Sequence, residues 1–322
     1  MTNSQHERIK GAVFGQFVGD AAALGTHWIY DTTELLARHG GSIEGFESPS
    51  EGHYHHGRFP GEQTHYGDAA KILVESLLDS ELRFDPDDFG KRFHSFFSSS
   101  SYSGYLDHAT KDTLRNIDAF ASENPNSRIP FAKLGSQDEQ MASVTSLAPL
   151  LLVSSSLSET LQTADEFTRI RQNNARARAY TKTLVAILYH LVQGRPPLEA
   201  VELSLQQLDP ANPYEAEAKQ RAQTAVDKRD RSVLETTAEL GQSCPLPGSF
   251  PSALHAFLRN ENDFRDAILE TIKAGGDNAG RAAIVGALCG ANLGFDSIST
   301  NWIQKLAHRP SLSALLSRNA FV

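Results

Sequence analysis

Apolar residues recur along the chain at the three- and four-residue spacing of α-helices. Ile9, Val13 and Phe17 repeat every four residues, and a stripe of glycines runs beside them. Such paired stripes predict a helix packed closely against a neighbour. The same periodicity marks residues 73–78, 89–97, 164–191 (long enough for two helices), 198–208, 214–226, 233–240, 264–272 and 302–306. Strand-type alternation followed by a hairpin turn is nearly absent, so the pattern predicts an all-α fold.

Three stretches interrupt this pattern. Residues 40–67 are rich in Gly, His, Ser and Pro and have no apolar period. A loop of that length inside a compact domain is often functional. Residues 122–137 and 242–251 contain prolines and are predicted to be connectors. Segments with candidate chemistry lie on both sides of these breaks, so we expect a single domain over residues 1–322 that closes around one site.

Composition narrows the class of protein. The chain is 40% hydrophobic and 21% charged, which is typical of a globular protein, and its net charge of −9 argues against non-specific nucleic-acid binding. The longest apolar run, residues 282–293, is shorter than the roughly 20 residues of a membrane span and is predicted to be a buried core helix. Two cysteines and a polar N-terminal segment favour the cytoplasm.

Asp20 lies among small and apolar residues near the end of the first predicted helix. A carboxylate in such surroundings must find hydrogen-bond donors or a cation. It therefore belongs either to a functional site or to an ordinary helix end, bonded to nearby backbone amides.

A second polar segment, residues 60–68, leads into a predicted helix. Glu62, Thr64, His65 and Asp68 gather oxygen and imidazole groups at the N-terminus of that helix, an end that attracts anions. The structural alternative is that Asp68 is simply the N-cap.

The third segment has a double glycine followed by polar residues. Gly275 and Gly276 are expected to stop one helix, and Asp277 or Asn278 to cap the next. The free amides there could hold a phosphate or a sugar, although an ordinary helix connector explains the same residues. Arg281 can share a helix face with Asp277, either as a surface ion pair or as a cation inside a site.

Histidines at positions 53, 55 and 56 raise the question of a zinc site. Zinc ligands are usually spaced along regular elements, whereas this stretch lies in a predicted loop. A solvated loop or a contact with substrate is the favoured interpretation.

In this order, the segments resemble the ADP-ribosylglycohydrolase family, especially its J-crystallin-like branch. The matching segments are residues 15–25 (opening Gly-Asp helix), 63–68 (Thr-Asp-Asp-Thr metal motif), 142–152 (middle helix), 171–175 (substrate-side loop), 249–254 with 274–278 (Gly-Gly-Asp signature) and 296–302 (closing segment). The resemblance implies an orthogonal all-α bundle that hydrolyses an N- or O-glycosidic bond to ADP-ribose or a related ribosyl group. It also implies that the turns near residues 68 and 277 meet across a shared cleft.

The chain departs from the family pattern at the metal motifs. His65, Tyr66 and Gly67 follow Thr64, where the family has two adjacent aspartates, and Ala279 and Gly280 replace the last two C-terminal ligands. Magnesium requires oxygen ligands in octahedral geometry. The resemblance therefore implies one magnesium ion at most, instead of the two that the family holds.

That one ion would be held by Thr64, Asp68 and Asp277; without an ion, Arg281 would supply the positive charge. In the expected mechanism, Asp68 or Glu62 activates water as general base, and the cation at Asp277 or Arg281 orients the ribose hydroxyls. The catalytic residues are thus expected to be Asp68, Glu62 and Asp277.

Around a small-molecule or protein-linked ADP-ribose, the substrate-binding residues implied are Asp20, His65, Tyr66, Gln172, Asn173, Gly275, Gly276, Asn278 and Arg281. The missing ligands leave a second interpretation open, a catalytically inactive ADP-ribose-binding or crystallin-like structural protein on the same fold.

Overall fold

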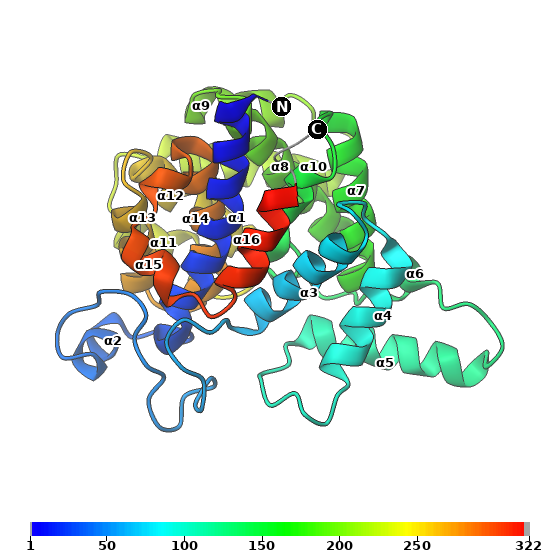
Figure 1. The fold of residues 1–322 in the computed structure, drawn as a ribbon. Coiled ribbons are helices and arrows are strands. Elements are labelled where there is room, and N and C mark those ends of the chain that lie inside the picture. The colour runs from blue at the N-terminus through cyan, green and yellow to red at the C-terminus, as the bar shows by residue number, and fades with distance from the viewer. Residues whose placement is uncertain (1, 319–322) are drawn as a thin grey trace.

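All regular structure in the computed structural model, which describes residues 2–318, is helical (Figure 1). The α-helices are α1 (Asn3–Ala23), α2 (Thr32–Arg38), α3 (His65–Asp79), α4 (Pro86–Phe97), α5 (His108–Glu123), α6 (Phe131–Leu134), α7 (Leu157–Arg171), α8 (Ala175–Val192), α9 (Pro197–Leu205), α10 (Pro213–Asp227), α11 (Val233–Leu240), α12 (Leu246–Arg259), α13 (Phe264–Lys273), α14 (Asn278–Leu293), α15 (Thr300–Lys305) and α16 (Arg309–Arg318). Short 3₁₀ turns are η1 (Leu24–Thr26), η2 (Val144–Ser146), η3 (Ala148–Leu152) and η4 (Phe295–Ser297). The all-α expectation is confirmed.

The centre of the bundle is the pair formed by α1 and α14, which pack along each other more extensively than any other two described helices. Glycines make this possible. A Cβ atom on Gly286 would lie 2.0 Å from the carbonyl oxygen of Gly15, and one on Gly15 would lie 2.1 Å from that of Gly286. Backbone therefore touches backbone, and the glycine stripe seen in the sequence faces α14. Helix α14 is buried from Asn278 to Ala291, as the apolar run predicts.

The expected breaks are partly confirmed. The 164–191 stretch divides into α7 and α8, and residues 39–64 form a long irregular loop before α3. The connector expected over residues 242–251 is wrong in its second half, because α12 begins at Leu246 and contains Pro251. Pro247 lies in the first helical turn, whose amides have no partner in the helix, whereas Pro251 lies inside the helix, where a proline is uncommon and instead indicates a loop.

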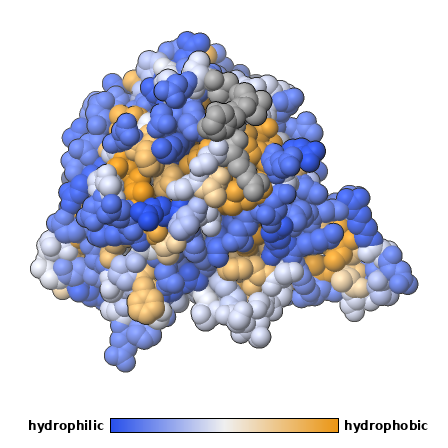
Figure 2. All heavy atoms as spheres, viewed as in Figure 1, coloured by the Kyte–Doolittle hydropathy of each residue, from blue (hydrophilic) through white to orange (hydrophobic). Residues whose placement is uncertain are grey.

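Hydrophilic residues predominate over the outer parts of the face shown in Figure 2, and apolar residues gather toward its middle. Among the helices of residues 2–318, none combines the length and the apolar character that crossing a bilayer requires. In Figure 1, α1 runs down the bundle to the edge where α2, the long loop and the start of α3 lie.

We predict that Gly286→Ala lowers the free energy of unfolding by about 1–3 kcal/mol, because the new methyl group overlaps the backbone of α1. Helix propensity alone would raise stability by up to about 1 kcal/mol, so the sign of the change separates the two effects. Urea denaturation of the variant and the wild type measures it. A variant as stable as the wild type would show that the two helices are not held at backbone contact.

Candidate functional site

Three turns meet at one end of the α1–α14 pair. The Trp28 amide donates to the Gly276 carbonyl, and the Gly276 amide donates to the Ile29 carbonyl, each over 2.8 Å. At the start of α3, the Tyr66 hydroxyl donates to Asp277 Oδ2, also over 2.8 Å. The turn after α1 is thus paired with the double-glycine turn, and the first turns of α3 and α14 lie together, but the expected cleft shared by Asp68 and Asp277 is not formed, because Asp277 is fully buried and Asp68 faces a separate cavity.

Asp277 is the fully buried centre of this junction. Its carboxylate caps α14, resolving the choice between Asp277 and Asn278, and it accepts hydrogen bonds from His27 Nε2 (2.8 Å) and from Tyr66. Burial by itself raises the pKa of Asp277, but the hydrogen bonds from His27 and Cys244 outweigh it and hold that pKa well below its usual range. The site therefore contains a carboxylate that stays ionised and is already fully engaged.

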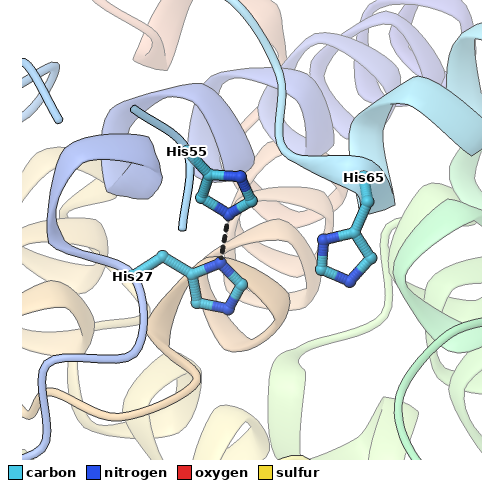
Figure 3. Close-up of side chains that lie close together, drawn as sticks. All are labelled: His27, His55 and His65. Atoms are coloured by element: carbon cyan, nitrogen blue, oxygen red, sulfur yellow. Dashed lines mark hydrogen bonds between the residues drawn. The ribbon is translucent and has the colours of Figure 1, made fainter. Parts of the chain in front are cut away.

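Three histidines from separate segments surround one gap beside Asp277. His27 follows η1, His55 comes from the long loop and His65 begins α3. His27 Nδ1 lies 2.9 Å from His55 Nε2, and one ring nitrogen from each of the three lies within 4.8 Å of the others (Figure 3). Burial lowers the pKa of His65 to about 4 and that of His55 well below its usual value, so these two rings are neutral at pH 7.

The favoured solvated-loop interpretation of the histidine stretch is wrong for two of its members. His53 and His55 are buried, and only His56 is exposed. His53 Nε2 donates to the carbonyl oxygen of His27 over 2.8 Å, which fixes the loop against the turn after α1. A sequence window around residues 53–56 contains neither His27 nor His65, so it gives no sign of the cluster.

Asp20 is a buried carboxyl group whose donors lie far along the chain. Its Oδ2 accepts from the Thr64 amide (2.7 Å) and its Oδ1 from the Thr64 hydroxyl (2.5 Å). Desolvation raises the pKa of Asp20 to about 7, against the Thr64 hydrogen bonds, which favour the ionised form. The helix-end interpretation, with donors from nearby amides, is therefore wrong: Asp20 joins α1 to the start of α3.

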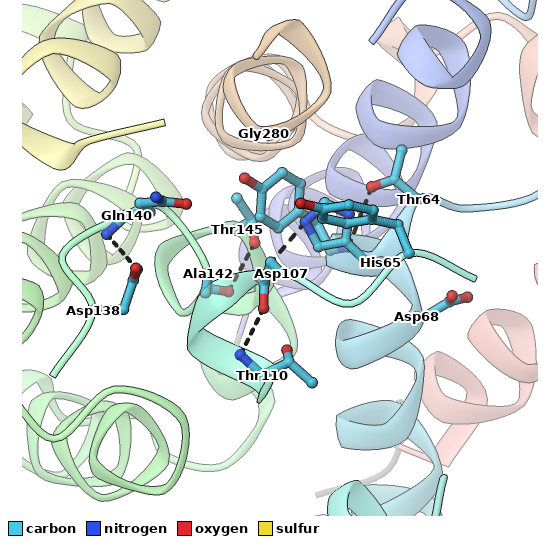
Figure 4. Close-up of polar contacts among 12 residues, drawn as sticks. Thr64, His65, Asp68, Asp107, Thr110, Asp138, Gln140, Ala142, Thr145 and Gly280 are labelled. Atoms are coloured by element: carbon cyan, nitrogen blue, oxygen red, sulfur yellow. Dashed lines mark hydrogen bonds and ion pairs between the residues drawn. The ribbon is translucent and has the colours of Figure 1, made fainter. Parts of the chain in front are cut away.

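Asp68 and Glu62 line a cavity to which Asp277 does not contribute. Asp68 receives two hydrogen bonds from Arg58 (3.2 and 2.6 Å) and one from the Tyr102 hydroxyl (2.9 Å). It lines a cavity of about 620 Å³ together with Glu62. In Figure 4 its carboxylate points away from His65. Asp68 is not the N-cap of α3, because Thr64 occupies that position.

The three expected magnesium ligands do not form one site in this arrangement. The Thr64 hydroxyl donates to Asp20, Asp68 pairs with Arg58, and Asp277 accepts from His27. Magnesium prefers several oxygen ligands arranged octahedrally around one point. The residues present do not fit such a site.

The double-glycine turn is already hydrogen-bonded internally. The Asp277 amide donates to the Gln242 carbonyl (2.8 Å), and the Asn278 amide donates to the Gly276 carbonyl (2.8 Å). The Arg281 guanidinium donates to the carbonyl oxygens of Gln242 and Gly275. The free amides expected after Gly276 are thus occupied, and Arg281 braces the turn instead of facing a carboxylate.

The remaining expected ligand residues act on backbone. The Asn278 side chain donates to the Thr26 carbonyl (3.2 Å) and ties α14 to η1. Gln172 is buried, and its amide donates to the carbonyls of Asp138 (3.0 Å) and Gln140 (2.9 Å). The Asn173 side chain donates to the Lys133 carbonyl over 3.4 Å. All three side chains therefore bind backbone groups of neighbouring segments.

Sequence reasoning missed an aromatic cleft that opens over the histidine cluster. Its volume is about 350 Å³, and its lining residues are Trp28, Tyr30, Tyr54, Tyr105, Asp107, His108, Gln140 and Cys244. We call this the aromatic cleft.

Trp28 is the floor of the aromatic cleft, stacked on His27 with ring centroids 4.0 Å apart. It holds a left-handed backbone conformation (φ 63°), which is uncommon for a bulky residue and often marks a functional position. The one local feature of the sequence that could have indicated Trp28 is its position shortly after the Gly-Asp segment at the end of α1.

Asp107 is the carboxylate of the aromatic cleft. Its Oδ1 accepts from the Thr110 amide (2.6 Å) as the N-cap of α5, and its Oδ2 lies 3.6 Å from His65 Nε2. Figure 4 shows Asp107 on the side of α3 opposite to Asp68. Its only local signal is that of an ordinary helix cap, which is why the pattern of the sequence did not single it out.

Comparison with known proteins gives a consistent result. A family model described as ADP-ribosylglycohydrolase matches residues 1–321. The chain is 27% identical to Crystallin J1A of Tripedalia cystophora, over 93% of this chain and 92% of that protein. It is 24% identical to human ADP-ribosylhydrolase ARH3, over 92% and 88%. A solved ADP-ribosylglycohydrolase-related protein complex has the same fold, with a TM-score of 0.66, 23% identity and coverage of 99% and 98%.

We predict that Asp20→Asn changes the pH dependence of stability. Between its usual pKa of 3.8 and the folded value of about 7, the native state keeps a proton on Asp20 that the unfolded chain has released. This group therefore makes the wild type less stable as pH rises through that window, and the variant lacks the effect. The slope of unfolding free energy against pH should become more positive by about 1.4 kcal/mol per pH unit.

Urea denaturation of both proteins at several pH values across that window measures the two slopes. Equal slopes would contradict a protonated Asp20 in the folded protein.

Proposed function

Because this chain belongs to the ADP-ribosylglycohydrolase family, we propose that it hydrolyses a glycosidic bond to ADP-ribose or a related ribosyl group in the aromatic cleft. Family membership supports a hydrolase-type function. The proposal adds the type of bond that is cleaved and the cleft in which the reaction takes place. The observation that carries it is a cleft with aromatic walls and a carboxylate, Asp107, among its lining residues. The two unpaired cysteines are consistent with the proposed location, the cytoplasm.

The aromatic cleft suits a ligand with flat, weakly polar faces. Trp28 meets Tyr54 edge-on at 5.0 Å and Tyr105 at 4.6 Å between ring centroids. Tyr54 and Tyr30 remain exposed at the rim, so their rings are accessible to a ligand. Aromatic side chains bind nucleobases by stacking, and tyrosine hydroxyls add hydrogen bonds to sugar groups.

Asp107 is the proposed general base, in place of Asp68 and Glu62. A water molecule held beside Asp107 attacks the anomeric carbon, Asp107 accepts its proton, and the bond from that carbon to the leaving nitrogen or oxygen breaks. The leaving group takes up a proton from solvent. The Thr110 amide holds the orientation of the Asp107 carboxylate, and His65 Nε2 lies 3.6 Å from its other oxygen. Because the oxygen groups that magnesium would need are engaged elsewhere, we propose that this reaction does not use magnesium.

A second function is ligand binding without turnover. The observation that favours it is Asp277, whose two oxygens both accept hydrogen bonds inside the protein and are buried from solvent. A carboxylate in that state contacts neither a metal ion nor a substrate. The similarity to Crystallin J1A is compatible with this alternative.

Asp107→Asn should lower kcat for release of ADP-ribose by about 10²- to 10⁴-fold with little change in KM, because it removes the base without removing cleft surface. Donors to assay are ADP-ribosylated arginine, ADP-ribosylated serine and small-molecule ADP-ribosides. Glu62→Gln, in the 620 Å³ cavity, is the matched control, and its kcat should stay within about twofold of the wild-type value. Adding magnesium chloride to the wild type should likewise change kcat by no more than about twofold. Loss of activity in Glu62→Gln alone would move the general base to the other cavity.

Trp28→Ala should weaken binding of ADP-ribose by about 10-fold or more in isothermal titration calorimetry, because it removes the floor on which a base stacks. Leu234→Ala, an exposed apolar side chain on α11, is the control for general loss of surface. Tight binding of ADP-ribose by a wild type that turns over none of the donors would establish the second function. Absence of both binding and turnover would reject both.

A further inference from the structure

We propose that His27, His55 and His65 bind one transition-metal ion of the zinc class, beside Asp277 and beneath Trp28. The inference concerns a binding site and does not depend on the proposed hydrolysis. It differs from a magnesium site in its ligands, because all three are imidazole nitrogens.

The geometry of the three rings is close to that of a metal centre. The His27 Nδ1 and His55 Nε2 atoms are 2.9 Å apart, and the nearest nitrogen of His65 completes a set within 4.8 Å. Figure 3 shows one nitrogen of His65 directed at the hydrogen-bonded pair. Metal–nitrogen bonds of about 2.0–2.1 Å in a tetrahedron place ligand nitrogens about 3.3 Å apart. The pair must open by a few tenths of an ångström while His65 moves inward.

Unsatisfied nitrogens indicate that something binds in this gap. Both ring nitrogens of His65 are buried without a hydrogen-bond partner among residues 2–318, and one of them is directed at the gap. Buried polar atoms are paired in the great majority of cases, and each exception needs a reason. Ring stacking accounts for the nearly parallel planes of His27 and His65, 11° apart, but it leaves these nitrogens unpaired. A metal ion provides a partner for His65 directly.

The second layer of contacts orients the ligands. The His27 Nε2–H group donates to Asp277 Oδ1, which leaves the lone pair of Nδ1 facing the gap. The Tyr66 hydroxyl holds the other oxygen of Asp277. A carboxylate behind a ligating histidine is the usual arrangement at metal sites and supplies negative charge next to the ion. When the ion binds, the proton that His55 Nε2 shares with His27 moves to His55 Nδ1.

The ligand chemistry selects the class of metal. Imidazole nitrogens suit zinc, copper, nickel and cobalt, whereas magnesium favours oxygen. Three histidine ligands leave one tetrahedral position for a water molecule or a ligand group. The segment that carries His65 is the one that resembles the magnesium motif of the family, so the change of residue type at that position goes with a change of metal class.

The test is titration of the full chain with Co²⁺ after the chain has been stripped of metal by a chelator and dialysed. We expect the absorption bands of tetrahedral cobalt to reach an end point at one equivalent, Zn²⁺ to displace the cobalt stoichiometrically, and a large excess of Mg²⁺ to leave it in place. His55→Gln and His65→Gln should each weaken Co²⁺ binding by about 100-fold or more, a loss at least as large as that of an outer-layer partner.

His56→Gln is the matched control, because this neighbour in the same loop is exposed and lies outside the cluster. It should bind Co²⁺ like the wild type. A stripped wild type that shows no stoichiometric cobalt bands would overturn the proposal whether or not the variants fold. So would equal binding in all three variants. The cobalt titration does not measure turnover of ADP-ribosyl donors, so its result stands even if the proposed hydrolysis is not found.

Discussion

Backbone contact between α1 and α14 is the constraint on which the rest of the structure depends. It brings Gly15 and Gly286, which are 271 positions apart in the sequence (286 − 15), into backbone contact. Once the two helices are in register, the turn that follows α1 must lie beside the turn that precedes α14. The Trp28 amide then donates to the Gly276 carbonyl, the Gly276 amide donates to the Ile29 carbonyl, and His27 contacts Asp277. The polar groups of the site are placed by this packing and not by their own attraction.

Burial decides what those polar groups do. A carboxylate removed from water has to be neutralised or surrounded by donors. Asp277 and Asp20 illustrate the two outcomes, since hydrogen bonds from His27 and Cys244 keep Asp277 ionised, whereas desolvation outweighs the bonds from Thr64 and raises the pKa of Asp20. Histidine is the other solution, because a neutral imidazole can be buried at lower cost than a charge. In this chain the junction of α1, α3 and α14 has one ionised carboxylate and several imidazoles, a composition that suits a different metal from a cluster of aspartates.

The fold was accessible from the sequence because its signals are local. The spacing of Ile9, Val13 and Phe17 and the apolar run at 282–293 report helices directly, and the double glycine at 275–276 reports a turn with left-handed backbone. The start of α12 was mispredicted because Pro251 lies inside the helix, where a proline removes a backbone hydrogen bond and normally ends a helix. The family resemblance placed the right segments together, and the Tyr66–Asp277 hydrogen bond is the contact that joins them.

The sequence by itself determined the helices, the turns and the family, since each depends on neighbouring residues or on motifs read in order. Only the tertiary structure decided which side chains share a site. His27 and Asp277 are 250 positions apart and His27 and His55 are 28 apart, so no local window contains the cluster. Asp68, two residues after Tyr66, faces another cavity, because successive positions on a helix point in different directions. The rotation of α3 and its long-range packing fix the direction of the Asp68 side chain, and the residues adjacent to Asp68 in the sequence do not reveal either.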